Sequence, residues 1–272
     1  MPSSDAQKRL RRLLWGVFLV VLAACRPREA EVVLPTVVDL DTAATQAVLT
    51  REAPPPGFAS VSFPGVDANL DDIPGWRSEF SLAFNGNFSR TSRSATALTE
   101  GVQRYNLLQN ARRLTISFVN TLQADANPIA LEIVTLGEDP FLVRNGVCIR
   151  AEDEARLAAQ LSAGAVLGGV RQAVSAPQRA IINGQQAWRY TFTHEDLVLP
   201  GLSFGDDSRV TGLTGELWVS PALNAVVRYY LNLDVENVGL LESALPVTGT
   251  LLLRYDLYLE ETPPNISVPF GC

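Results

Sequence analysis

The stretch from Leu251 to Leu259 reads Leu-Leu-Leu-Arg-Tyr-Asp-Leu-Tyr-Leu, with an apolar or aromatic residue at every odd position. Arg254, Asp256 and Tyr258 occupy even positions. Because successive side chains of a β-strand point to opposite faces, this period of two predicts a long strand with one buried face. Residues 229–235 alternate in the same way. We therefore expect two long strands near the C-terminus.

Shorter alternating runs occur at 80–84, 114–118 and 188–192. Turn sequences separate the apolar runs: Asn-Gly pairs stand at 145–146 and 183–184, and Pro-Ala-Leu-Asn occupies 221–224. Such residues favour the tight turns that join neighbouring antiparallel strands. Consecutive hairpins predict an antiparallel meander.

Residues 151–172 break this alternation. Acidic residues at the start, followed by Leu157, Leu161 and Val166 at near-helical spacing, predict one or two helices, with Ala165 on the face toward the sheet. A long antiparallel sheet with one apolar face curls around whatever covers that face. The predicted fold is therefore α+β and mainly antiparallel, a curved half-open β-barrel with one or two helical inserts covering its concave face.

The N-terminus has the features of an export signal. A basic region at 8–12 precedes an apolar run at 13–21, which is too short for a good spanning helix of about 20 residues. The following Leu22-Ala23-Ala24-Cys25 resembles the lipobox of bacterial lipoproteins. That resemblance implies cleavage before Cys25 and a diacylglycerol on its thiol, with fatty acyl chains such as palmitate. The alternatives are an ordinary signal peptide cut after Ala24 and an uncleaved anchor.

These features divide the chain into three segments. We expect a lipoprotein signal peptide at 1–24, a lipidated tether and Pro-rich linker at 25–56, and a single β-rich domain at 57–272. The expected location is extracytoplasmic, with Cys25 holding the protein at the outer face of the cell membrane, or at an outer membrane if the cell has one. A net charge of −7 and a pI of about 4.9 argue against nucleic acid as a partner.

With Cys25 assigned to lipid, Cys148 and Cys272 remain. Free thiols are uncommon outside the cytoplasm, so these two residues are expected to form a disulfide that pins a C-terminal strand to the middle of the fold. Two unpaired buried thiols are the alternative, because the sequence does not show that their Cα atoms lie within about 7 Å.

The sequence provides no catalytic constellation, so we predict that the protein is not an enzyme. Residues 201–205 match the Gly-x-Ser-x-Gly pattern of a nucleophile elbow, but Pro200 replaces the strand end before it, and His194 precedes the serine instead of following it. His194 has no second histidine to form a metal site. Thr193 and Asp196 resemble a capping box and predict a short helix there. No metal and no cofactor are expected.

The order of strands and helices on a chain with a lipobox resembles the LolA/LolB-like fold, especially the lipoproteins of the LppX/LprG type. The resemblance covers roughly residues 76–270. Its local sequence phrases are 141–148, 182–190 and 215–219, the last followed by 226–229. It implies a half-open barrel with a lipid cavity on its concave side.

The expected function is that of a carrier that binds a lipid or a lipidated protein in an apolar cavity. The alternative is a non-enzymatic structural or interaction module of the cell envelope whose concave face is filled by its own side chains. Residues placed on the concave face by strand alternation are the candidate cavity lining, although an ordinary core has the same pattern. They are Phe80, Leu82, Phe84, Leu114, Ile116, Phe118, Trp188, Tyr190, Phe192, Leu231, Leu233, Leu253 and Leu257.

Overall fold

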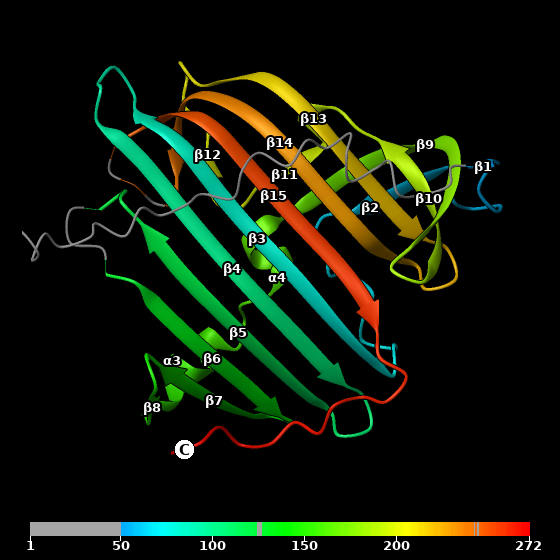
Figure 1. Cartoon of the computed structure of the whole chain (residues 1–272), viewed down its shortest axis with the longest axis vertical. Coiled ribbons are helices and arrows are strands. Elements are labelled where there is room, and N and C mark those ends of the chain that lie inside the picture. Colours follow the sequence, from blue (N-terminus) through cyan, green and yellow to red (C-terminus); the bar gives the residue numbers. More distant parts are fainter. Residues whose placement is uncertain (1–49, 124–126, 242, 244) are drawn as a thin grey trace, which may run out of the picture. The chain divides into compact units, whose positions relative to one another are not determined.

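The structure is a computed structural model that describes residues 50–123, 127–241, 243 and 245–272. The predicted signal peptide, Cys25 and the linker up to residue 49 lie outside the described residues. Fifteen strands form one open sheet with the order β1-β9-β10-β13-β14-β15-β3-β4-β5-β6-β7-β8 (Figure 1). In addition, β2 and β11 pair with β9, and β12 pairs with β14.

The strands are β1 (Thr50–Arg51), β2 (Ser60–Phe63), β3 (Gly75–Phe88), β4 (Ser94–Asn106), β5 (Ala111–Asn120), β6 (Ile129–Leu136), β7 (Asp139–Arg144), β8 (Val147–Ile149), β9 (Gly169–Ile182), β10 (Gln185–Thr191), β11 (Leu197–Val198), β12 (Leu202–Ser203), β13 (Arg209–Ser220), β14 (Ala225–Leu240) and β15 (Val247–Leu259). The helices are α3 (Glu152–Ala158), α4 (Ala163–Leu167) and the 3-10 helix η1 (His194–Asp196). These strand pairs are antiparallel. The predicted fold class is confirmed.

The expected turns join the expected strands. Asn145 and Asn183 each have φ of 50°, and the glycine after each has φ of 80°. Both central residues of a type I′ hairpin turn need positive φ, which asparagine tolerates and glycine adopts freely. The turns therefore connect β7 to β8 and β9 to β10, as the Asn-Gly pairs predict.

After the short strands β1 and β2, which both pair with β9, the chain continues near the centre of the sheet with β3. Strands β3 to β8 form a meander that ends at one edge, whereas β9 lies near the opposite edge. The segment from 150 to 168 must cross the sheet between them. Its helix α4 contacts the central strands β3 and β15, and Figure 1 shows it behind the sheet. We call the sheet face toward α4 the inner face.

The helical segment is shorter than predicted, and one predicted orientation is wrong. Both helices end before Gly168, and residues 169–172 belong to β9 because Val170 pairs with Phe63 of β2 and Leu197 of β11. Ala165 is exposed; the buried α4 residues are Ala163, Gly164 and Leu167. No helix within the described ranges is long and apolar enough to cross a membrane.

A second segment joins α4 over the inner face. Residues 58–73 contribute Phe63, Val66 and Leu70 to the core, each at most 2% exposed. We define residues 58–73 together with α4 as the cover. Hydrogen bonds attach it to its surroundings at several points. Trp76 Nε1 donates to the Leu70 carbonyl at 3.2 Å, and the Tyr190 hydroxyl donates to the Phe58 carbonyl at 2.7 Å. The Asn69 side chain donates to the Asn224 carbonyl at 3.0 Å, and backbone bonds join Val66 to Gly168 and Ser175 to Ala59. The cover is otherwise attached by apolar packing and by the pairing of β2 with β9.

Cys148 and Cys272 form a disulfide with a Cα–Cα distance of 5.4 Å, which confirms the predicted pairing. The expected attachment point is wrong, however. Cys272 follows a segment without strand after Leu259, and Cys148 belongs to β8 at the edge of the sheet. The bridge therefore holds the C-terminal segment against an edge strand. This segment also packs Ile266 against Ala111 and Val134 in a small second core.

Candidate functional site: the inner face and its cover

The residues predicted to line a cavity share the inner face. Their register aligns across strands: Leu253 of β15 lies opposite Leu82 of β3 and Leu231 of β14. Eleven of the thirteen are at most 5% exposed: Phe80, Leu82, Phe84, Leu114, Ile116, Trp188, Tyr190, Leu231, Leu233, Leu253 and Leu257. Phe118 and Phe192 are partly buried and pack against the same core.

This degree of burial describes a closed state. A side chain without accessible surface does not border a space large enough for water. Phe84, Leu114 and Leu233 have 0% exposure, so the inner face is filled at these positions. The assignment of these residues to lipid contact stays a prediction.

Phe80 and Gly101 show how tightly the inner face is packed. They lie opposite each other on β3 and β4, and a Cβ built on Gly101 would lie 2.2 Å from Cζ of Phe80. The aromatic ring therefore occupies the volume of the missing side chain. Sequence periodicity selects Phe80 but carries no signal for its pairing with a glycine.

Buried polar side chains interrupt the apolar inner face; besides Thr99, which lies opposite Leu82, four of them lie close together. Tyr229, Tyr255, Ser78 and Gln103 lie on the adjacent strands β14, β15, β3 and β4, and each is at most 3% exposed. Tyr229 is directly opposite Tyr255, and Ser78 is directly opposite Gln103. Ser78 also pairs with Leu257, two residues along β15 from Tyr255. We call these four residues the polar row.

The polar row has unsatisfied hydrogen-bonding groups. Within the described part of the chain, the hydroxyls of Ser78, Tyr229 and Tyr255 and Oε1 of Gln103 have no hydrogen-bond partner. Burial raises the pKa of Tyr229. Burial also raises the pKa of Tyr255, and the negative charges of Asp67 and Asp256 raise it further. The nearby Ser78 hydroxyl acts in the opposite direction, although its position relative to Tyr255 does not meet the geometry of a hydrogen bond. The tyrosines are therefore neutral hydroxyls at ordinary pH.

Sequence reasoning missed the polar row as a feature. The sequence contains a signal for part of it. Ser78 is two residues before Phe80 and therefore lies on the same face of the strand, so a polar residue continues the apolar stripe. Gln103 needs more than local sequence, because only its pairing with Ser78 places it on the inner face.

Arg112 is a charged residue next to the polar row, and it already has a hydrogen-bond partner and negative charges nearby. Arg112 alternates in phase with Leu114 on β5 and donates a hydrogen bond to the Ala159 carbonyl. Burial lowers its pKa, and the charges of Asp67 and Asp71 oppose that shift. The inner face thus combines neutral polar groups with a locally balanced cation.

Close backbone approaches occur at two glycines, one within the cover and one just after α4. A Cβ on Gly164 of α4 would lie 3.1 Å from the Cα of Gly65 and 2.1 Å from Oδ1 of Asp67. Gly168 has φ of 74°, and a Cβ there would lie 1.8 Å from the Val198 carbonyl oxygen. Glycine is therefore required where α4 meets the rest of the cover and where it leads into β9.

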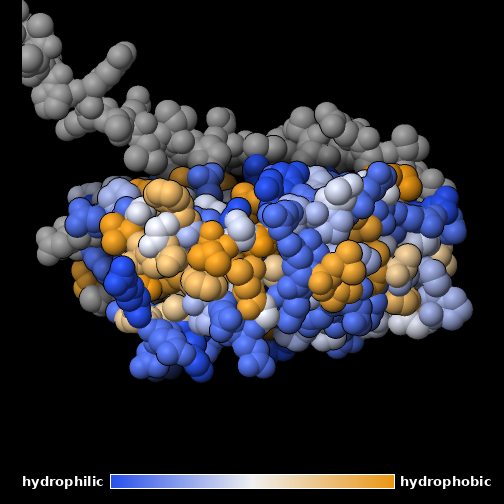
Figure 2. Space-filling model, turned by 90° about the horizontal axis from the view of Figure 1, so that it is seen from below, coloured by the Kyte–Doolittle hydropathy of each residue, from blue (hydrophilic) through white to orange (hydrophobic). Residues whose placement is uncertain are grey.

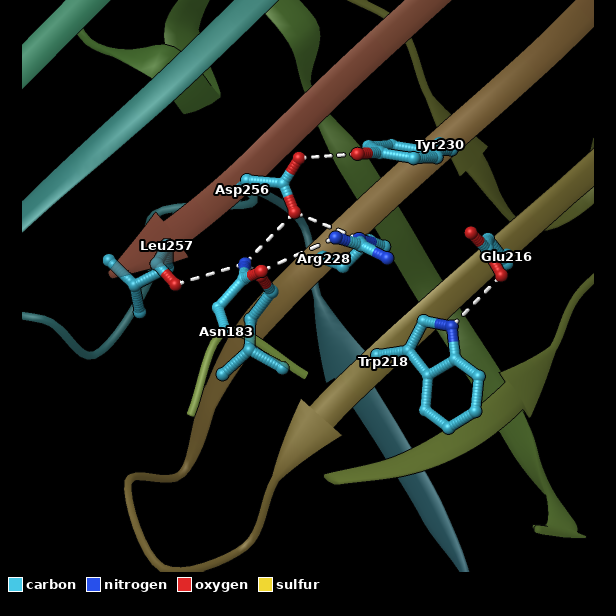
Figure 3. Close-up of polar contacts among 8 residues, drawn as sticks. Asn183, Glu216, Trp218, Arg228, Tyr230, Asp256 and Leu257 are labelled. Atoms are coloured by element: carbon cyan, nitrogen blue, oxygen red, sulfur yellow. Dashed lines mark hydrogen bonds and ion pairs between the residues drawn. The ribbon is translucent and has the colours of Figure 1, made fainter. Parts of the chain in front are cut away.

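The outer face of the sheet carries a separate polar cluster (Figure 3). Asp256 accepts hydrogen bonds from Asn183 Nδ2 at 2.9 Å, from Arg228 Nε at 2.8 Å and from the Tyr230 hydroxyl. Burial alone lowers the pKa of Arg228, but Asp256 more than reverses that effect. Trp218 Nε1 donates to Glu216 nearby at 3.0 Å. This cluster fixes the β9–β10 turn to β14 and β15, a structural role.

An open groove of about 520 Å³ adjoins this cluster. Glu79, Glu100, Ser117 and Arg254 contribute to its lining. Phe80 and Ile116, two of the predicted lining residues, also border it, so the groove combines charged and hydroxyl groups with apolar ones.

The β4–β5 turn and the C-terminal segment, which Figure 1 draws at the lower end of the domain, each carry an exposed apolar residue. Leu108 is 91% exposed and Phe270 is fully exposed. The view from below shows orange patches separated by blue ones, so apolar residues do not merge into one surface (Figure 2).

The other motifs found in the sequence do not assemble into a reaction site. Thr193 and Asp196 form the predicted capping box of η1, with His194 in its first turn. Gly201 to Gly205 runs through a turn and the two-residue β12, without a helix after the serine. Among the described residues, no group of three or more His, Cys, Asp or Glu is placed to hold a metal ion.

No protein-family profile and no curated protein matches this sequence. A search of solved structures finds similarity to LprF from Mycobacterium bovis. The match covers 76% of this chain and 92% of LprF, with 12% identity and a TM-score of 0.32. At that TM-score it supports no inference about this chain, so the fold and site rest on the strands and contacts described above.

Proposed function

We propose that this protein is an extracytoplasmic lipoprotein, anchored by lipid on Cys25, that binds a lipid between the inner face and the cover. The observation that carries the proposal is the broad apolar inner face, interrupted by the polar row, beneath a cover that packs on it through side chains such as Phe63, Val66 and Leu70. Acyl chains would replace the apolar contacts of cover residues such as Leu70 and Leu167. The gain in free energy would be similar, at about 25 cal/mol per Å² of apolar area removed from water. Binding then requires the cover to move.

One observation favours a second candidate, a structural or interaction module of the envelope with a filled core. The predicted lining residues are packed in the closed state, as in an ordinary core. The two candidates differ in whether the purified chain holds a lipid other than the one on Cys25.

The test uses the full chain purified from membranes in mild detergent, followed by extraction and lipid mass spectrometry. We expect about one non-covalent lipid per chain. Ala163→Trp puts a bulky side chain on the buried side of α4, where Ala163 is 0% exposed, and should exclude that lipid. Ala165→Trp is the matched control on the exposed side of the same helix and should retain it. Ala163→Leu replaces the tryptophan variant if the latter does not fold.

If the wild-type chain carries no lipid beyond a detergent-matched control protein, the filled-core module is the better description. Anchoring is tested separately with Cys25→Ser. This variant should leave the detergent phase and wash from membranes with carbonate. Retention after the wash would mean that residues 13–24 act as an uncleaved anchor.

A further inference from the structure

We infer that the polar row of Ser78, Gln103, Tyr229 and Tyr255 selects an uncharged acylglycerol with a free hydroxyl over a phospholipid or a fatty acid. The inference rests on the proposed function and adds the class of ligand. Its basis is that four buried polar groups on adjacent strands lack partners within the described chain, while the surrounding face is apolar.

Buried polar groups in folded proteins are nearly always hydrogen-bonded, so a cluster of exceptions needs an explanation. Other buried polar atoms without a partner are spread over the described chain, such as Ser175 Oγ and Asn232 Oδ1, whereas Tyr229, Tyr255, Ser78 and Gln103 contribute one each on strands that are neighbours in the order β14-β15-β3-β4. Scattered packing defects have no reason to share one face and adjacent strands. A ligand held beneath the cover would meet all four groups together.

The donors and acceptors of the row define the complementary ligand. Ser78, Tyr229 and Tyr255 each offer one O–H donor, and Oε1 of Gln103 is an acceptor. Ester carbonyls of a ligand would accept from the hydroxyls, and a free ligand hydroxyl would donate to Gln103. A diacylglycerol has both kinds of group next to two acyl chains.

A charged head group does not fit the same place. An ionised phosphate or carboxylate in a buried site needs a paired cation or many donors. Arg112 already donates to the Ala159 carbonyl and lies near Asp67 and Asp71, whose charges would repel an anion. Burial keeps the row tyrosines protonated, so they present donors without charge.

The competing explanation is that the row is a plain packing defect. This predicts a different outcome for the same substitution, because removing an unpartnered buried hydroxyl relieves a desolvation penalty and changes nothing else. Tyr255→Phe should leave the lipid-free protein as stable as before, or more stable, under both explanations. Only the ligand-site explanation predicts weaker binding.

The experiment uses the full chain, delipidated in dodecyl maltoside and titrated with dioleoylglycerol, dioleoylphosphatidic acid or oleic acid, with tryptophan fluorescence as the readout. We expect dioleoylglycerol to bind most tightly. Tyr255→Phe and Ser78→Ala should each weaken it by about fivefold to a hundredfold, because one ligand oxygen loses its partner. Tyr258→Phe, at an outer-face position of the same strand, is the control and should bind like wild type.

The outcomes separate the inference from the proposed function. Equal or tighter binding of phosphatidic acid or oleic acid, or unchanged dioleoylglycerol binding in both row variants, overturns the inference while lipid binding stands. If none of the three lipids binds the wild-type chain, the proposed function fails as well.

Discussion

Asn183, in the turn between β9 and β10, donates a hydrogen bond of 2.9 Å to Asp256 of β15, 73 residues further along the chain. Its amide nitrogen also lies 3.1 Å from the Val227 carbonyl and 3.2 Å from the Leu257 carbonyl (Figure 3). A turn residue thus closes the gap between a hairpin tip and two central strands. Asn183 therefore has two roles: it adopts the positive φ of 50° that the turn requires, and its side chain holds the turn against β14 and β15.

Asn183→Gly should isolate the contribution of this side chain, because glycine accepts positive φ without strain. We expect the free energy of unfolding to fall by about 1 to 3 kcal/mol, since carbonyls and Asp256 lose a buried donor. Asn145→Gly is the matched control: the same turn type and φ occur there, but the side chain makes an exposed bond to the Ala130 amide. It should cost about 0.5 kcal/mol or less. Equal losses in urea unfolding would assign the effect to the turn alone.

The disulfide should contribute more to the free energy of unfolding than its position at the edge of the sheet suggests. The loop between Cys148 and Cys272 is long, with a sequence separation of 124, so Cys148→Ala should destabilise the domain by about 2 to 5 kcal/mol and lower the thermal midpoint by several degrees. The double variant with Cys272→Ala should lose no more than either single variant, because both remove the same bond. Two thiols that react in the folded wild-type domain would contradict the pairing.

Alkaline pH should unfold the domain through its tyrosines. Burial raises the pKa of Tyr190 from 10.0 to about 12, and burial also raises the pKa values of Tyr229 and Tyr255. Above pH 10 the unfolded chain loses these protons while the folded chain keeps them. The unfolded state then binds fewer protons, so stability is fully present below pH 10 and falls as the pH rises toward 12.

Urea unfolding between pH 8 and 11.5, with tyrosinate absorbance, measures this effect. Tyr190→Phe should be less stable than wild type at pH 8 by about 1 kcal/mol, because its hydrogen bond to the Phe58 carbonyl is lost. The difference should shrink above pH 10, where wild type loses its own contribution. Parallel curves for the two proteins across this range would show that Tyr190 ionises equally in both states.

Local sequence was sufficient for the elements whose signal is local. Alternation at 80–84 and 251–259 predicted β3 and β15, since strand periodicity depends on each residue's immediate neighbours. It failed at residues 169–172, where Val170 becomes strand through pairing with Phe63, a residue far away in sequence. The cover has no periodicity to detect, because turns and single contacts such as Trp76 with Leu70 shape it.

The residues of the candidate site also divide into those that local sequence predicts and those that it does not. Apolar lining residues follow from alternation, so Leu82 and Leu253 were found. Gln103 was not, because its face is known only once β4 is registered on β3. The inward side of α4 was mistaken at Ala165, since a helix of five residues is too short for its hydrophobic spacing to define a face.

The cover should open locally, before the sheet unfolds, if ligand entry depends on its movement. Ser162 caps α4 by accepting a hydrogen bond of 3.1 Å from the Ala165 amide. Ser162→Ala should weaken α4 by about 1 kcal/mol and so raise hydrogen exchange in residues 163–168 about fivefold, while exchange in β3 and β15 stays unchanged. Faster uptake of a fluorescent lipid should accompany this change. Thr193→Ala is the control, because it removes the cap of η1 and leaves the cover intact. If exchange in α4 rises only together with exchange in β15, the cover opens by global unfolding, and entry beneath it needs another route.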